Sequence, residues 1–149
     1  MRGIAFDLGT TTGWGAVNGT VMSGVLKLKG GRFEGGGMRF VRFADHVTEL
    51  LNRIKPEWVV FEEVRRHAGT DAAHIYGGLM AGLTSICEQR KIPYEGVPVG
   101  TIKKFWTGSG NAPKDAMIAV ARSKGFKVAD DNEADAIALL HWKMNELLI

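Results

Sequence analysis

Apolar residues in the first part of this chain fall into short unbroken runs, the pattern of buried β-strands. Residues 2–8 form one such run, which ends in Asp7-Leu8 and is followed by Gly9. Residues 13–18 and 20–27 are two further strand-like runs, and the Asn18-Gly19 dipeptide between them favours a type I′ hairpin. The first three predicted strands therefore form an antiparallel meander. Residues 30–37 hold five glycines in eight positions, which predicts a mobile surface loop.

After this loop the spacing of apolar residues changes to the helical period. One face of residues 40–54 is apolar, and the pattern stops before Pro56. Residues 57–64 again have the pattern of a buried strand, and a helix between two such strands favours a right-handed crossover that makes them parallel. The remaining predicted elements are a helix over 72–90, a strand over 92–99, and helical segments over 101–106, 113–124 and 131–147.

The order of these elements predicts an α/β fold of the ribonuclease H type. We expect a mixed five-stranded sheet, with strands 1–3 antiparallel and strands 4 and 5 parallel, flanked by helices. A length of 149 residues with 45% apolar side chains fits one domain over residues 1–149. No apolar run reaches the roughly 18 residues that span a bilayer, so we expect a cytoplasmic protein without membrane contact.

Acidic residues follow two of the predicted strands at matching points. Three apolar residues precede Asp7, and three precede Glu62, so the two carboxylates emerge side by side if the strands are parallel neighbours. Asp131 and Asp135 are four apart at the start of the last predicted helix and share one face of it, with Asn132 as a further oxygen ligand. Because hard oxygen ligands without His or Cys select Mg²⁺ or Mn²⁺, these acids predict a divalent metal site.

Other interpretations of these acids remain open. Asp131 is also suited to cap the last helix. Glu63 points to the opposite face from Glu62, since neighbours on a strand alternate, and is expected to pair with Arg65 or Arg66. Asp7 is harder to explain structurally, because an acid after three buried positions loses hydration unless something binds it.

The net charge of +3 hides an uneven distribution of basic residues. Residues 101–127 hold one acid and six basic side chains, which are Lys103, Lys104, Lys114, Arg122, Lys124 and Lys127. Phe105 and Trp106 lie among them, which favours a phosphate-binding surface over a merely solvated helix face. The glycine loop carries Arg32, Phe33 and Arg39, and it either clamps DNA or is a plain flexible connection.

In its acidic segments and in its basic stretch, the chain resembles the RuvC-type Holliday junction resolvases, particularly the small phage-borne ones. Asp7-Leu8-Gly9, with Gly13 beyond it, is similar to the family's first acidic strand and hairpin. Phe61-Glu62-Glu63-Val64 resembles the second acidic strand, and residues 134–139 resemble the C-terminal acidic helix. Residues 102–114 are the most specific stretch, because the family carries Lys, two glycines, Ala and Lys at the same spacing.

This resemblance implies a Mg²⁺-dependent endonuclease, with Mn²⁺ as a substitute, that makes paired cuts in Holliday or other branched DNA junctions. The metal ligands it implies are Asp7, Glu62 and Asp135, with Asp131 or Asn132 assisting. Lys114 is expected to act in catalysis, and DNA contacts are expected from Lys103, Lys104, Lys114, Arg32, Arg65 and Arg66. The host would be a bacterial or phage-infected cell.

Two departures from the family pattern affect these expectations. Asn132 stands where many members carry an Asp or His, which leaves open whether it or Asp131 completes the site. Arg65, Arg66 and His67 follow the second acidic strand, where bacterial members often carry an aromatic residue that wedges into the junction.

A homodimer is expected as well, because a four-way junction has two-fold symmetry. Small residues recur at every fourth position of the predicted helix over 72–90, where they would let another backbone approach. They form two stripes, Ala73-Gly77-Ala81 and Gly78-Gly82.

Three other functions share some of these features. A ribonuclease H that cuts RNA–DNA hybrids has the same kind of acids. Residues 7–11, Asp-Leu-Gly-Thr-Thr, also match the phosphate loop of actin-like ATPases and sugar kinases, although the chain has no second such loop. A catalytically silent junction-binding protein would keep the lysines without needing the acids.

Overall fold

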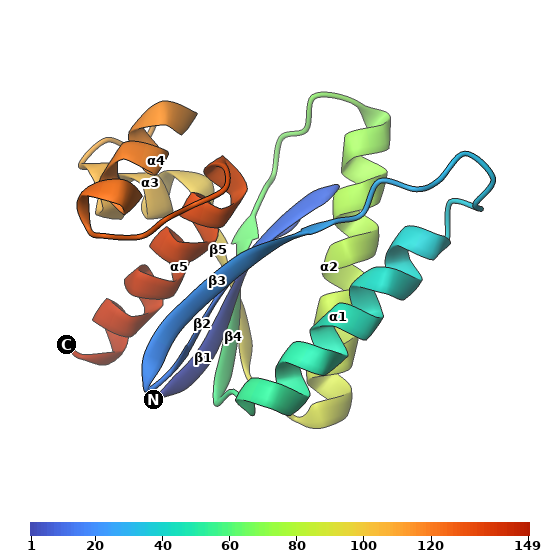
Figure 1. The fold of residues 1–149 in the computed structure, drawn as a ribbon, viewed down its shortest axis with the longest axis horizontal. Helices are drawn as coiled ribbons and strands as arrows, with labels where there is room; N and C mark the ends of the chain where they lie inside the picture. Colours follow the sequence, from blue (N-terminus) through green and yellow to red (C-terminus); the bar gives the residue numbers. More distant parts are fainter.

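The computed structural model describes residues 1–149, and one five-stranded sheet lies at its centre (Figure 1). Its strands are β1 (Arg2–Asp7), β2 (Thr11–Asn18), β3 (Thr20–Lys27), β4 (Trp58–Glu63) and β5 (Tyr94–Pro98). The order across the sheet is β3-β2-β1-β4-β5. β1, β2 and β3 pair antiparallel, whereas β4 is parallel to both β1 and β5. This confirms the mixed sheet of the ribonuclease H type that the sequence predicts.

Helices cover both faces of the sheet (Figure 1). On one face lie α1 (Met38–Ile54) and α2 (Thr70–Arg90), and on the other lie α3 (Val99–Thr107), α4 (Lys114–Ser123) and α5 (Asp131–Leu147). None of these helices combines the length and the apolar character that a membrane crossing requires.

The alternation of side chains along the central strands divides the core into two layers. Ile4, Phe6 and Phe61 pack against α1 and α2. Ala5 and Val60 pack in the second layer, with the apolar residues of α3, α4 and α5. Side chains two residues apart on a strand point to the same face. The side chains at positions 7 and 62, two residues after Ala5 and Val60, therefore lie on the α5 side of the sheet.

The hairpin between β2 and β3 forms where predicted, but its turn is not type I′. A type I′ turn needs positive φ at both central residues. Gly19 has φ of 78°, whereas Asn18 does not have a positive φ and remains paired with Thr20 in the ladder. The prediction of the turn type was therefore wrong, because pairing extends to the last residue before the glycine.

Candidate active site

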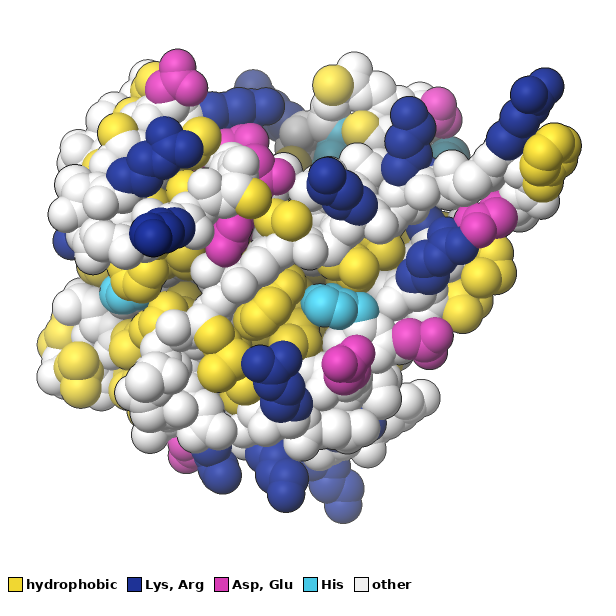
Figure 2. Space-filling model, in the orientation of Figure 1, with side chains coloured by type: hydrophobic (Ala, Val, Ile, Leu, Met, Phe, Trp, Pro, Cys, Tyr) yellow, Lys and Arg dark blue, Asp and Glu magenta, His cyan; other side chains and the backbone are white.

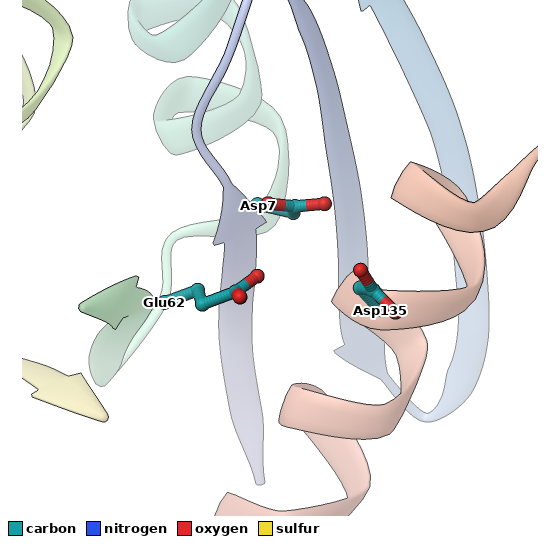
Figure 3. A group of neighbouring side chains, drawn as sticks. All are labelled: Asp7, Glu62 and Asp135. Carbon is teal, nitrogen blue, oxygen red and sulfur yellow. The ribbon is translucent and has the colours of Figure 1, made fainter. Parts of the chain in front are cut away.

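Three carboxylates from three separate elements meet at one end of the sheet. They belong to Asp7 at the end of β1, Glu62 near the end of β4 and Asp135 in the second turn of α5. One oxygen of each lies within 4.8 Å of one oxygen of each of the others. Figure 3 shows the three side chains directed toward one shared space.

Strand register brings the first two carboxylates together. Phe6 pairs with Phe61 in the parallel ladder between β1 and β4, so the next residues along, Asp7 and Glu62, emerge beside each other. Both are one step past a residue of the α1/α2 layer and therefore face α5. Glu63 faces the other way, and its carboxylate pairs with Arg65 at 3.0 Å, which confirms the predicted ion pair.

A glycine in β2 allows α5 to reach this end of the sheet. Gly13 pairs with Asp7 in the antiparallel ladder. A Cβ at Gly13 would lie 1.9 Å from the carbonyl oxygen of Asn132, so any side chain there would displace the first turn of α5. The absence of that side chain is what lets Asp135 approach the two strand carboxylates.

The electrostatics of the group oppose its full ionisation in the metal-free protein. Burial, followed by the charges of Glu62 and Asp135, raises the pKa of Asp7 well above its usual range. Burial raises the pKa of Glu62, although Lys103 lowers it in part. Burial and the charge of Glu62 raise the pKa of Asp135 from 3.8 to about 7. Three acids at this spacing therefore need a cation to be ionised together at neutral pH.

The donor set fits a hard divalent cation. All three ligand atoms are carboxylate oxygens, with no His or Cys in the group. Oδ1 of Asp135 is buried and has no hydrogen-bond partner in the protein, so it is available to bind a metal ion. Asp7, Glu62 and Asp135 are accordingly the residues that could hold such an ion.

The fourth predicted ligand, Asp131, lies outside the 4.8 Å group. It sits in the first turn of α5, where its carboxylate is 3.9 Å from Nζ of Lys114, and its charge raises the pKa of Asp135. Asp131 is not the helix cap considered above, because Oδ1 of Asp130 accepts the hydrogen bond from the Glu133 amide at 2.9 Å. The side-chain amide of Asn132 donates a hydrogen bond to Oδ2 of Asp130, so Asn132 takes part in the cap at the start of α5.

Two of the predicted DNA-contacting lysines lie close enough to the carboxylates to affect them. Lys103 lowers the pKa of both Glu62 and Asp135, and Lys114 lowers the pKa of Asp135. The Lys114 side chain is 81% exposed, so its ammonium group is also available to a phosphate. Figure 2 shows Lys and Arg side chains beside acidic ones over this part of the molecule, at upper left.

The other predicted DNA contacts do not contribute to the pKa shifts of the three carboxylates. Lys104, Arg65 and Arg66 are exposed, and Arg65 is engaged by Glu63. Arg32 lies on the loop between β3 and α1, with its guanidinium 5.6 Å from the centre of the Phe33 ring. That loop projects from the body of the protein (Figure 1).

Sequence reasoning missed Tyr76 of α2. Its hydroxyl donates to the carbonyl oxygen of Glu62 at 2.6 Å and accepts from the amide of Val64 at 3.1 Å. The hydroxyl thus fixes the backbone on both sides of Glu63 at the end of β4. Because its partners are main-chain groups 12 and 14 residues away, no motif in the sequence could have indicated it.

The fold and the carboxylate group together define a ribonuclease H-like domain with a candidate three-carboxylate metal centre. No protein-family model matches the chain. The chain is 29% identical over 150 residues to the crossover junction endodeoxyribonuclease RuvC of Halorhodospira halophila, covering 94% of this chain and 89% of that protein. It is 31% identical to RuvC of an Anaeromyxobacter species over 102 residues, covering 68% of this chain and 50% of that one.

The solved structures give the same result. T. thermophilus RuvC in complex with a Holliday junction substrate superposes with a TM-score of 0.74 at 26% identity, covering 93% of this chain and 89% of that one. By sequence and by structure, this chain is a homologue of the RuvC Holliday junction resolvases.

Proposed function

We propose that this protein is a Mg²⁺-dependent, structure-selective endonuclease that resolves four-way DNA junctions. The observation that supports this most directly is the meeting of Asp7, Glu62 and Asp135 within 4.8 Å at one end of the sheet. The likeness to proteins named crossover junction endodeoxyribonuclease supports the choice of substrate.

In this function the carboxylates bind the metal ion and the lysines bind the phosphate. Asp7, Glu62 and Asp135 hold the divalent ion, and Mn²⁺ can replace Mg²⁺ because both accept oxygen ligands. When bound, the metal supplies a nucleophile at neutral pH and neutralises charge on the phosphate. Lys114 and Lys103 orient the phosphate beside the carboxylates, and Lys114 strengthens its contact as negative charge grows on the reacting group. Asp131, whose carboxylate lies 3.9 Å from the Lys114 ammonium, attracts this lysine toward the carboxylate group.

Charge-removing substitutions test the metal site. In Asp7→Asn, Glu62→Gln and Asp135→Asn, cleavage of a synthetic four-way junction should fall at least a hundredfold, while junction binding measured with Ca²⁺ in place of Mg²⁺ should persist. Glu63→Gln is the matched control, because its carboxylate pairs with Arg65 on the opposite side of the strand. Wild-type cleavage that continues in excess EDTA would contradict the proposal.

A panel of nucleic-acid substrates tests which structure the protein cuts. Junction, linear duplex, flap and RNA–DNA hybrid should be compared in single-turnover reactions with equal enzyme. The proposal expects the junction to be cut fastest and in both of two opposed strands. Preferential cutting of the hybrid would instead favour a ribonuclease H, and Mg²⁺-dependent binding of ATP would favour a nucleotide-binding protein.

We also propose that the protein acts as a homodimer through the outer face of α2. The two small-residue stripes of this helix differ in their surroundings. A Cβ at Gly78 would lie 2.5 Å from the Phe40 ring, so that glycine is required by packing against α1. A Cβ at Gly77 would meet nothing within 4 Å, so packing within the chain gives no reason for a glycine there. The Ala73-Gly77-Ala81 stripe therefore remains available to a second copy.

Sedimentation equilibrium tests the dimer. Gly77→Leu should lower the measured mass to that of a monomer and remove paired cutting. Gly35→Leu is the control, since it lies on the β3–α1 loop and also has nothing within 4 Å of a Cβ. A Gly77→Leu variant that keeps the wild-type mass would refute this interface.

A further inference from the structure

The start of α5 lies directly on the backbone of β2, on the face of the sheet opposite α1 and α2 (Figure 1). A Cβ at Gly13 would lie 1.9 Å from the carbonyl oxygen of Asn132. A Cβ at Gly15 would lie 3.4 Å from the carbonyl oxygen of Ala136. Backbone therefore packs on backbone here, without the interdigitating side chains that hold a packed helix in place along its axis. Contacts with β2 at these two positions thus do little to set how far along the sheet α5 begins.

A buried hydrogen-bonded pair joins this first turn of α5 to the next strand. Glu133 is only 6% exposed. Its Oε2 accepts a hydrogen bond from the hydroxyl of Ser23 on β3 at 2.6 Å, although the two residues are 110 positions apart in the chain. Its Oε1 accepts a second hydrogen bond, from the amide of Ala129 at 2.8 Å. One carboxylate therefore ties α5 both to the edge strand β3 and to the segment that leads into the helix.

A helix cap alone does not explain this arrangement. In a capping box, the glutamate at the third helical position bonds the amide of the cap residue itself. Here the cap residue is Asp130, yet Glu133 bonds the amide one residue earlier and uses its other oxygen on a different element. A buried carboxylate loses hydration that only such hydrogen bonds replace. The bond to Ser23 is therefore a tertiary contact that fixes where α5 starts against the sheet.

The position of this turn matters because Asp135 is only two residues beyond Glu133. Two residues correspond to roughly 3 Å along a helix, over which the backbone moves as one body, so a shift of the first turn shifts the Asp135 carboxylate with it. Mg²⁺ requires near-octahedral oxygen ligands at about 2.0–2.1 Å. A small displacement of α5 would therefore separate Asp135 from the two strand carboxylates that now lie within 4.8 Å of it.

We propose that Ser23 and Glu133 are positioning residues for the metal centre, and that their hydrogen bond sets the distance from Asp135 to the strand carboxylates. The proposal rests on the metal-dependent function proposed above and adds to it two residues that do not bind the ion. Neither residue belongs to the group of three carboxylates. Groups that orient metal ligands from outside typically influence metal affinity about 10- to 100-fold.

Ser23→Ala tests the proposal, because it removes the hydroxyl on β3 and leaves the bonds of the helix cap in place. Mn²⁺ affinity measured by calorimetry should fall about tenfold. The Mg²⁺ concentration for half-maximal junction cleavage should rise by a similar factor, while the rate at saturating Mg²⁺ should stay within about twofold of the wild type. Ser23→Thr keeps the hydroxyl and should restore the wild-type Mn²⁺ affinity.

A second variant tests whether the two residues act through one contact. Glu133→Ala removes both hydrogen bonds of the carboxylate, so it should weaken Mn²⁺ binding at least as much as Ser23→Ala does. The double variant should then bind Mn²⁺ as Glu133→Ala does, because two residues that share one interaction have non-additive effects. Additive losses of affinity would contradict the proposed contact.

Two controls separate positioning from a general loss of stability. Thr20→Ala alters an exposed residue at the other end of β3 and should leave both Tm and Mn²⁺ affinity unchanged. Val47→Ala opens a cavity in the core layer of α1 and α2, on the opposite face of the sheet. It should lower Tm at least as much as Ser23→Ala does, without changing Mn²⁺ affinity.

The outcomes separate this proposal from the one on which it rests. A wild-type protein that binds no Mn²⁺ and cuts no junction would overturn the metal-dependent function. If the wild type binds Mn²⁺ but Ser23→Ala binds it equally tightly, or if Val47→Ala loses as much affinity as Ser23→Ala, the positioning role is refuted and the metal-dependent function stands.

Discussion

Removing the charge of Asp135 should stabilise the metal-free protein, and the gain should increase with pH. Burial and the charge of Glu62 raise the pKa of Asp135 from 3.8 to about 7. A carboxyl whose pKa rises on folding contributes stability that is full below pH 3.8 and is lost as the pH rises to about 7. Asp135→Asn cannot ionise, so it escapes that loss while keeping the shape of the side chain.

The size of the effect follows from the pKa shift. One pKa unit corresponds to about 1.4 kcal/mol, so the shift corresponds to at most ~4 kcal/mol. Asp7 and Glu62 have raised pKa values as well, which means that the protonation cost is shared among the three. We therefore expect a gain of about 2–4 kcal/mol at pH 8, or roughly 5 to 15 °C in Tm for a chain of this length.

Urea and thermal denaturation in EDTA at pH 4, 6 and 8 measure this effect. The variant and the wild type should be equally stable at pH 4 and should diverge through pH 6 to pH 8. Saturating Mg²⁺ at pH 8 should then stabilise the wild type more than the variant. Asp45→Asn, at an exposed position of α1, is the control and should show no such trend. A difference for Asp135→Asn that is absent at pH 8, or constant across this range, would refute the reasoning.

Three further predictions concern the groups around the carboxylates. Gly13→Ala should destabilise the fold by about 1–3 kcal/mol or more, because its Cβ clashes with the backbone of α5, and should weaken calorimetric Mn²⁺ binding. Unchanged Mn²⁺ affinity would contradict this. Tyr76→Phe removes both hydrogen bonds at the end of β4, so it should lower stability by about 1–3 kcal/mol and raise the Mg²⁺ concentration needed for half-maximal cleavage. A Mg²⁺ titration that matches the wild type would exclude this positioning role. Lys114→Ala should lower the single-turnover rate at saturating junction, whereas Lys124→Ala, whose ammonium lies over the Trp106 ring, should only weaken binding and reduce its salt slope by about one. Identical behaviour of the two lysine variants would mean that the basic residues form one diffuse surface.

The sequence by itself was enough to predict the sheet, the meeting of the two strand carboxylates and the presence of an acid from the last helix beside them. Strand periodicity is local, so the matching runs before Asp7 and Glu62 were enough to predict that both side chains share a face. The same parity separated Glu62 from Glu63, and the ion pair of Glu63 with Arg65 agrees with it. A helix between the two strands was enough to predict that they run parallel.

The tertiary structure decided which groups of α5 reach the carboxylates. A helix can begin one residue earlier or later at little local cost, and three oxygen-bearing residues in a row, Asp130, Asp131 and Asn132, suit its start equally well in sequence. Contact with Gly13 of β2 fixes the position of this helix. Asp130 consequently becomes the cap, Asp131 lies beside Lys114, and Asp135 joins the metal group.

The end of the pairing between β1 and β4 at Phe6 and Phe61 likewise could not be predicted from the sequence. Both predicted strands extend past Phe6 and Phe61, to residues 8 and 64, so the local pattern predicts continued pairing. Tyr76, on a helix that packs against the sheet, supplies the hydrogen bonds that the neighbouring strand would otherwise provide. This replacement of strand pairing by a side chain depends on groups that only folding brings together, which is why the role of Tyr76 emerges from the three-dimensional structure alone.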